Sequence, residues 1–410
     1  MIFLFVAGLL GLYFVALSSD GLRSRTAARG LDAPVWLLLS ASLAADLALV
    51  RFLPLPTVGP TVLPLGAAVI VGHAVAYALD VRRGQALAAR PLALALYFAQ
   101  FPLLVAGPLV RYRDFALQEA RLSTSLGAFT YGTRRIAIGL IKIGLIAGVL
   151  AGPADEIYSL APAKIGADAA WLAALCFSLQ IYYEFSGYAD IAIGLGRMLG
   201  FRYPENLRRP YTADSVREFW RRWNVTLMTW LRDYLRLPIA GRDHPTPSLY
   251  LNIVVGMCIV GLWHGGGQSV IIWSVYSSLW LALEAIGLGA AMARLPAIVR
   301  HAYLLLVVVI GWAMFRAETM TGAWAFLRAM AGMNGAVGTT AQSYFTVTFS
   351  TTLGLALFFA GPMVPTVSRW RVGLDAATAS LLMMLAATGL FIWRPIAIAL
   401  DFVLPARRVR

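Results

Sequence analysis

Two polar side chains stand out because they lie beside apolar stretches, where an unused polar group is costly. His264 lies in the run GLWHG (261–265), between two apolar segments, and three glycines, 265–267, follow it directly. Those glycines let a backbone or a ligand approach closely. Asn224 follows Trp223 on a charged segment 40 residues earlier. These two positions are the predicted catalytic residues of the chain.

The other three histidines, His73, His244 and His301, are favoured as structural or solvated side chains. None of the four has the spacing of a metal site, so no metal centre is expected. The sequence also lacks the G-x-S-x-G turn of serine hydrolases and the phosphate-binding loop of ATPases. No bound cofactor is therefore predicted.

The composition is that of an integral membrane protein. Of the 410 residues, 60% are hydrophobic and 13% are charged, and the mean hydropathy is +0.72. Such a chain is too apolar for a soluble domain. We predict a single all-α domain over residues 1–410 with about ten or eleven membrane helices, because a helix satisfies its own backbone groups in lipid. The predicted spans are 2–18, 34–53, 62–80, 130–151, 168–183, 249–263, 267–290, 299–316, 344–362 and 376–394.

The net charge of +14 comes almost wholly from arginine and gathers in short connections, as expected for the cytoplasmic loops of a membrane protein. A nucleic-acid partner is therefore not predicted. The arginine distribution places the N-terminus outside and the C-terminus in the cytoplasm. If the segment 91–109 crossed the membrane completely, the arginines that follow it would lie outside the cell. We expect it to be re-entrant and broken by Pro102, Gly107 and Pro108.

The least hydrophobic region, 184–248, holds the densest polar chemistry. Its first part, EFSGYAD (184–190), combines Glu184, Ser186, Tyr188 and Asp190 with a glycine that we expect to break the helix. Two interpretations of Glu184 stay open: a functional carboxylate, or one that nearby arginines neutralise. Asp190 is expected to form an ion pair, with Arg197 as the candidate partner.

A helix is predicted over about 214–237, with its N-cap at Thr212 or Asp214. Its aromatic residues recur at three- and four-residue spacing and arginines occupy much of the rest, which is typical of a helix lying along a membrane interface. Asn224 lies on the edge of the aromatic face. The arginines beside it suit an anionic ligand such as a phosphate-bearing acyl carrier.

Taken in order, seven blocks of the sequence resemble the membrane-bound O-acyltransferase family, in particular its bacterial alginate O-acetylation type. They cover about residues 60–330. The blocks are YALDVRRG (77–84), QFPLLVAGPLVRYRDF (100–115), LQIYYEFSGYADIAIGLGRMLGF (179–201), PENLRRPY (204–211), EFWRRWNVTLMTWLRDYL (218–235), GLWHG (261–265) and GWAMFRAET (311–319). The resemblance implies a ring of helices around a central catalytic tunnel, where a cytoplasmic funnel and an outer cavity meet at an essential histidine. His264 matches that histidine.

The resemblance further implies acyl transfer to a hydroxyl. His264 would take the hydroxyl proton during attack on a thioester carbonyl, and exclusion of water would protect the thioester. The expected donor is cytosolic acetyl-CoA or an acyl-carrier thioester, and the expected acceptor is an exported polysaccharide or cell-envelope glycan. An SGNH-type acetyltransferase, periplasmic or membrane-anchored, is the expected partner, and the lipid bilayer of the bacterial inner membrane is the expected location. The residues expected to bind substrate are Trp223, Trp263, Arg221, Glu184, Ser186, Tyr188, Asp190, Trp230, Arg232 and Asp233.

One position departs from the resemblance. Polysaccharide-acetylating relatives usually carry histidine where this chain has Asn224, which can hydrogen-bond a thioester oxygen but cannot act as a base. Proton transfer then falls to His264, and the identity of the acceptor stays open. Two alternatives remain: D-alanyl transfer from a carrier protein to teichoic acid by a close branch of the family, and an acyl conduit or transporter in which His264 does no chemistry.

Overall fold

The computed structural model describes residues 62–87, 89–104, 107–119, 121–234, 247–264, 268–334 and 339–361. The expected spans at 2–18, 34–53 and 376–394 lie outside these ranges, as do His244 and the glycines after His264. Within the described ranges every regular element is a helix, apart from one isolated β-bridge between Ile165 and Thr339. The all-α prediction is confirmed for this part of the chain.

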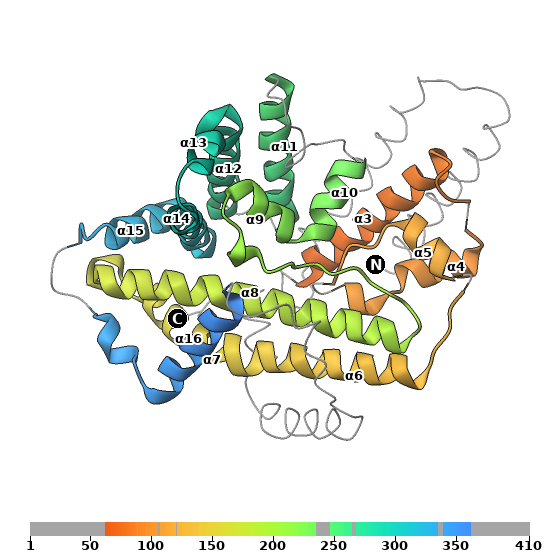
Figure 1. The fold of residues 1–410 in the computed structure, drawn as a ribbon, viewed down its shortest axis with the longest axis horizontal. Coiled ribbons are helices and arrows are strands. Elements are labelled where there is room, and N and C mark those ends of the chain that lie inside the picture. Colours follow the sequence, from red (N-terminus) through yellow and green to blue (C-terminus); the bar gives the residue numbers. More distant parts are fainter. Residues whose placement is uncertain are drawn as a thin grey trace.

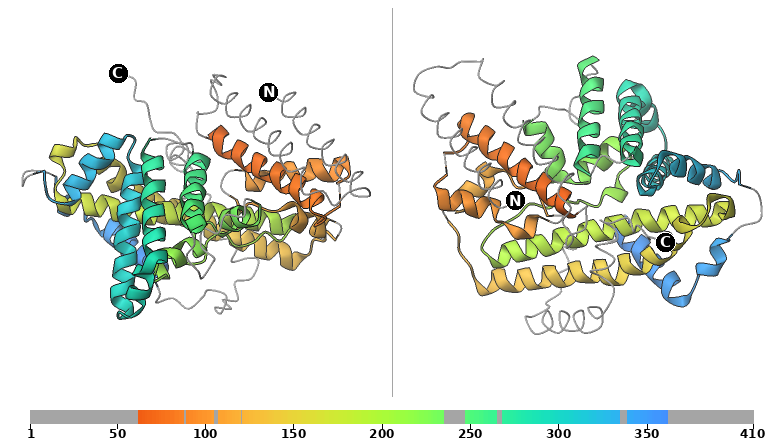
Figure 2. Two further views of the ribbon diagram at one scale, coloured as in Figure 1. Left: turned by 90° about the horizontal axis from the view of Figure 1, so that it is seen from above. Right: turned by 180° about the vertical axis from the view of Figure 1, so that it is seen from behind.

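Two long helical segments run side by side through the molecule (Figures 1 and 2). The first comprises α6 (Leu126–Ile141), a π-helical turn (Lys142–Ala147) and α7 (Gly148–Ser159), which together form 34 continuous helical residues. The second is α8 (Ala167–Met198), with 32 residues. Helix α8 of this pair carries the polar residues Glu184, Ser186, Tyr188 and Asp190.

The expected break at Gly187 is wrong, because α8 continues through it to Met198. A Cβ atom at Gly187 would lie 2.7 Å from the carbonyl oxygen of Gly139 on α6 and 2.6 Å from Cγ1 of Ile143. The glycine therefore lets two helix backbones approach closely, as small residues do in membrane helix pairs. It does not act as a hinge.

Some helices of the described chain are long and apolar enough to span a membrane. By length and composition, three segments qualify: Leu126–Ser159, Gln268–Ala293 and Ala297–Arg316. Shorter apolar helices cover Pro91–Leu103, Asn252–Trp263 and Val347–Ala360. These segments agree with a polytopic membrane protein.

The segment 91–109 is broken as predicted. Helix α4 (Pro91–Phe98) ends early, and a short 3₁₀ turn (Phe101–Leu103) containing Pro102 follows it. A Cβ at Gly107 would lie 2.5 Å from Cα of Leu103, so the chain turns back tightly on itself there. Its re-entrant path through a membrane stays a prediction.

Most of the other helices, including α3 and α9 to α12, lie on the side of the long pair that α8 forms (Figures 1 and 2). Helix α10 contacts α3, α9 contacts α12 and α14, and α16 contacts α7. Their bounds are α3 Val62–Arg82, α5 Tyr112–Glu119, α9 Val216–Arg222, α10 Val225–Tyr234, α11 Pro247–Trp263, α12 Gln268–Leu283, α13 Gly289–Ala293, α14 Ala297–Arg316, α15 Met320–Met330 and α16 Val347–Ala360. A π-helical segment, Glu284–Leu288, joins α12 to α13, and 3₁₀ turns cover Pro162–Lys164, Pro210–Thr212 and Ala341–Tyr344.

The single helix expected over 214–237 is two helices. Helix α9 begins after Ser215, whose side chain accepts a hydrogen bond from the Glu218 N–H, so the N-cap is neither Thr212 nor Asp214. The chain then leaves the helical path at Trp223 and Asn224 before α10 begins. The residues of 235–237 lie outside the described chain.

Candidate active site

The break between α9 and α10 places Asn224 at a corner of the chain. Trp223 is extended, with φ −94° and ψ 128°, and Asn224 has a positive φ of 46°. Asparagine tolerates this left-handed conformation better than most residues with a Cβ atom. Asn224 is 9% exposed, and its carbonyl accepts the Met228 N–H at 3.0 Å to begin α10.

His264 directly follows the last residue of α11. Its ring Nδ1 lies 2.7 Å from the carbonyl oxygen of Val260, one helical turn earlier. A carbonyl oxygen can only accept, so Nδ1 carries the hydrogen in this contact. The neutral ring then has an unprotonated Nε2, which is the nitrogen available to accept a proton.

Four aromatic side chains, Trp223, Trp273, Trp312 and Phe315, form what we call the aromatic cluster. The ring centroids of Trp273 and Phe315 lie 6.2 and 5.8 Å from that of His264. Trp312 lies 5.7 Å from Trp273 and 4.9 Å from Trp223. The cluster therefore connects His264 to the residue that directly precedes Asn224. Trp273 and Trp312 are stacked, and the other ring pairs of the cluster are tilted or edge-on.

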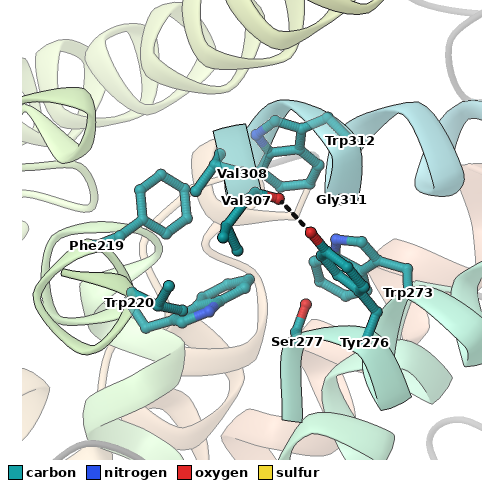
Figure 3. Close-up of a pocket in the computed structure, with 10 residues that line it drawn as sticks. Phe219, Trp220, Trp273, Tyr276, Ser277, Val307, Val308, Gly311 and Trp312 are labelled. Carbon is teal, nitrogen blue, oxygen red and sulfur yellow. Dashed lines mark hydrogen bonds between the residues drawn. The ribbon is translucent and has the colours of Figure 1, made fainter. Parts of the chain in front are cut away.

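A small pocket opens beside this cluster (Figure 3). Trp220 and Phe219 of α9 line one side, and Trp273 and Trp312 line the opposite side. Trp273 thus takes part in both the pocket wall and the packing against His264. The pocket is mainly apolar, as expected for a space that excludes water.

The polar residues of α8 have a different environment. Asp190 forms ion pairs with Arg135 at 2.5 Å and Lys142 at 2.6 Å, both on the neighbouring long helical segment. The expected ion pair is confirmed, but the expected partner Arg197 is wrong, because α6 lies against this face of α8. Ser186 accepts a hydrogen bond from the same lysine at 2.6 Å.

Glu184 is 2% exposed and accepts a hydrogen bond from Gln180 at 3.1 Å. Its second carboxyl oxygen has no hydrogen-bond partner among the described residues. No ion pair joins it to an arginine in the described chain, so the interpretation of Glu184 as an arginine-neutralised carboxylate finds no contact there. Tyr188, one turn later, is half-buried.

Two of the predicted substrate-binding tryptophans, Trp230 and Trp263, pack against α3. Trp230 donates its indole N–H to the carbonyl of Gly72 at 3.0 Å. A Cβ at Gly72 would lie 3.3 Å from Cη2 of Trp263. Both rings therefore pack at Gly72, where they fix α10 and the end of α11 to α3.

The predicted charged residues of α9 and α10 form ion pairs, in which Arg221 and Arg232 are exposed and Asp233 is mostly buried. Arg221 is 3.8 Å from Glu218, and nearly half of its side chain is exposed. Asp233 accepts hydrogen bonds from Arg111 at 2.5 Å and Arg113 at 2.7 Å, and it pairs with Arg232 at 3.2 Å.

Partial burial opposes the charge of Asp233, but its hydrogen bonds and attraction to arginines outweigh that effect. The pKa of Asp233 is consequently lowered from its ordinary value. Its carboxylate holds three arginines together.

Sequence reasoning missed Trp273, Trp312 and Phe315. Trp312 and Phe315 lie in the block GWAMFRAET, so that block contained the signal, whereas Trp273 looked like any aromatic residue in an apolar span. It also missed Glu284, whose carboxylate accepts the backbone N–H groups of Val216 and Arg217 at 2.7 and 2.9 Å. That carboxylate fixes the start of α9, where an anion is favourable.

Comparison with known proteins shows the family of the chain. The model of the membrane-bound O-acyltransferase family matches residues 73–321, a range that includes Asn224, His264 and the whole aromatic cluster. This chain belongs to the membrane-bound O-acyltransferase family. The resemblance seen in the sequence is confirmed.

Proteins with three different named activities are similar to this chain. The chain is 43% identical over 260 residues to a probable alginate O-acetylase AlgI of Pseudomonas fluorescens, covering 63% of this chain and 52% of the relative. It is 32% identical over 252 residues to a peptidoglycan O-acetyltransferase of Helicobacter pylori, covering 59% and 47%. It is 26% identical over 232 residues to a teichoic acid D-alanyltransferase of Bacillus subtilis, covering 52% and 57%. The chain thus spans about half the length of these relatives of the membrane-bound O-acyltransferase family.

Proposed function

We propose that this protein transfers an acetyl group from a thioester to a hydroxyl of an exported polysaccharide or cell-envelope glycan. The observation that carries the proposal is the Nδ1 contact of His264 with Val260, which leaves Nε2 as a base beside the aromatic cluster. Support for an acetyl group comes from the relatives, since the alginate and peptidoglycan O-acetyl enzymes are more similar to this chain than the D-alanyl enzyme.

In the proposed reaction, Nε2 of His264 accepts the proton of the acceptor hydroxyl as its oxygen attacks the thioester carbonyl. The tetrahedral intermediate then collapses, the carbon–sulfur bond breaks, and the leaving thiolate takes the proton from the imidazolium. Val260 keeps the ring oriented and its carbonyl stabilises the transient positive charge. The contact with Val260 is sufficient to orient the imidazole before the proton is accepted.

Asn224 is proposed to hydrogen-bond the thioester oxygen. Its side-chain amide offers a donor that strengthens its bond as negative charge develops on the carbonyl oxygen. It cannot remove a proton, so the two positions have separate roles: Asn224 stabilises charge and His264 moves the proton.

The wider setting follows the family resemblance. We propose a ring of about ten or eleven helices around a tunnel, with the N-terminus outside and the C-terminus in the cytoplasm. A cytosolic acetyl-CoA or acyl-carrier thioester would enter from the inner side. The acceptor would be reached from the outer side, directly or through an SGNH-type acetyltransferase partner.

The test is acyl transfer by the protein in lipid nanodiscs, with radiolabelled acetyl-CoA as donor and alginate or peptidoglycan fragments as acceptors. His264→Ala and the longer His264→Gln should each reduce transfer about 10²-fold or more, because neither side chain is a base. Asn334→Ala is the matched control, since Asn334 donates to the carbonyl of Pro162 at the surface. Normal turnover by both His264 variants would contradict the role of His264 as the base.

D-alanyl transfer is separated in the same assay by the donor. A carrier protein loaded with D-alanine is offered in place of acetyl-CoA. Transfer from that carrier alone, with none from acetyl-CoA, would replace the acetyl proposal with the D-alanyl one.

A further inference from the structure

The N-terminus of α10 is capped by a residue outside that helix. An asparagine just before a helix usually caps the first turn with its own side chain, and Asn224 occupies that place. Here another asparagine, Asn206, does so. Its side-chain Oδ1 accepts hydrogen bonds from the Thr226 hydroxyl at 2.7 Å and the Thr226 N–H at 3.3 Å, and its carbonyl accepts the Val225 N–H at 2.9 Å.

This contact belongs to a buried web that joins three segments of the chain. Asn206 is 1% exposed and Thr226 is 7% exposed. The Thr226 hydroxyl also accepts the Leu109 N–H at 2.9 Å, and the Arg208 N–H donates to the carbonyl of Arg222 at 2.9 Å. The loop after 107, the loop around 206 and the turn at 222–226 are therefore held in one register.

Asn224 lies at the centre of this web in an unfavourable conformation. Its φ of 46° brings the Cβ atom close to the backbone, and such outliers persist only where the surroundings hold them. Its side-chain amide forms no hydrogen bond with any residue that the structure describes. The side chain of Asn224 therefore does not cap α10, although asparagine at this position commonly does.

We propose that Asn206 is a positioning residue for acyl transfer. By capping α10 in place of Asn224, it holds the corner in the left-handed conformation and leaves the Asn224 amide free for the substrate. This inference rests on the proposed function. It assigns the role to Asn206 through Asn224, with no contact between Asn206 and the reacting atoms.

Kinetics of two variants of Asn206 test the role. Asn206→Ala removes the acceptor and should lower kcat about 10- to 100-fold with KM nearly unchanged, because a small displacement of a reacting group has a large effect on rate. Asn206→Asp keeps an oxygen at the same place and should retain most of the activity. A larger loss for Asn206→Asp than for Asn206→Ala would overturn the capping role.

A second pair of variants covers the case in which Asn206→Ala does not fold. Thr226→Val has nearly the same shape but lacks the hydroxyl that bridges Asn206 and Leu109, so kcat should fall. Thr226→Ser keeps the hydroxyl and should recover the rate. Equal rates for the valine and serine variants would contradict the proposal.

Coupling to Asn224 separates positioning from a general structural role. Asn224→Gly keeps the left-handed backbone, which glycine adopts freely, but removes the amide. In that background Asn206→Ala should lower kcat by less than about threefold, because the group it positions is gone. Loss by the same factor in both backgrounds would overturn the positioning role. Asn334→Ala is again the control and should leave kcat unchanged.

Hydrogen exchange gives a readout that does not depend on turnover. Amide exchange in the peptide 222–228 should rise in Asn206→Ala and stay near wild type in Asn206→Asp. Unchanged exchange in Asn206→Ala would overturn the capping contact itself. Absence of acetyl transfer by the wild type would contradict the proposed function, while the exchange result would still decide whether the cap holds.

Discussion

Alanine at Gly187 should force α6 and α8 apart. Its Cβ would lie 2.6 Å from Cγ1 of Ile143 and 2.7 Å from the carbonyl oxygen of Gly139. Carbon contacts are best at about 3.5–4.0 Å, so the shortfall at Ile143 is about 1 Å. The isoleucine can change rotamer, but the Gly139 oxygen moves only with the α6 backbone.

The size of the effect follows from two opposing contributions. Overpacking of a tight interface destabilises by about 1–3 kcal/mol. Alanine is also a better helix former than glycine by about 0.5–1 kcal/mol. We therefore expect Gly187→Ala to lower the free energy of unfolding by about 1–2 kcal/mol.

Gly354→Ala provides the matched control, because Gly354 lies inside α16 and nothing lies within 4 Å of the Cβ that alanine would add. This control should be as stable as wild type or slightly more stable. Both variants are compared by unfolding in mixed detergent micelles with added denaturing detergent. Equal stability of Gly187→Ala and Gly354→Ala would refute the close-approach interpretation.

Three further predictions concern the corner, the buried ion pairs and acid stability. Asn224→Gly should unfold at the same temperature as wild type or higher, whereas Asn224→Ala should be less stable than the glycine variant by about 1 kcal/mol, measured by thermal unfolding. Asp190→Asn should destabilise by about 1–3 kcal/mol in the same assay, below the full range for buried pairs because Arg135 is 20% exposed. The lowered pKa of Asp233 means that its pair with Arg111 stabilises the fold above about pH 4 and is lost as pH falls through the folded-state pKa. Between pH 7 and pH 3, wild type should therefore lose more thermal stability than Asp233→Asn does, and an equal loss would contradict this assignment.

Local sequence signals predicted the helical class and the break at 91–109. Pro102 cannot continue a helix, and Gly107 allows a turn that other residues would obstruct, so both effects are encoded within a few residues. Composition alone indicated a membrane protein. The ordered blocks indicated the family because each block keeps its residue types and its place in the chain.

The role of Gly187 could not be predicted from its own neighbourhood. A glycine can break a helix or let two helices meet, and only Gly139, on another helix, decides between them. The corner at Asn224 is similar, since its cap comes from Asn206. Both features depend on contacts between segments that are distant in the sequence.

The candidate site was predicted only in part, because it too depends on contacts between segments that are distant in the sequence. His264 and Asn224 were singled out by residue type, but their connection runs through Trp273 and Trp312, which lie on two other helices. Asp190 was correctly expected to pair, yet its partner was sought on its own helix. Sequence spacing shows which side chains can meet on one helix and gives little information about those that meet across two.

The length of the segment Leu126–Ser159 makes this protein sensitive to bilayer thickness. Its 34 residues extend about 51 Å, whereas the hydrocarbon layer is about 30 Å thick. If this segment stood upright, roughly two fifths of its length would lie beyond the hydrocarbon, and a shorter overhang requires a strong tilt. Its Arg135 and Lys142 are joined to Asp190 of α8, so α8 must follow any tilt that this segment adopts. Lipids of different acyl length would then rotate this helix pair as a unit and change the depth of the polar residues that it carries.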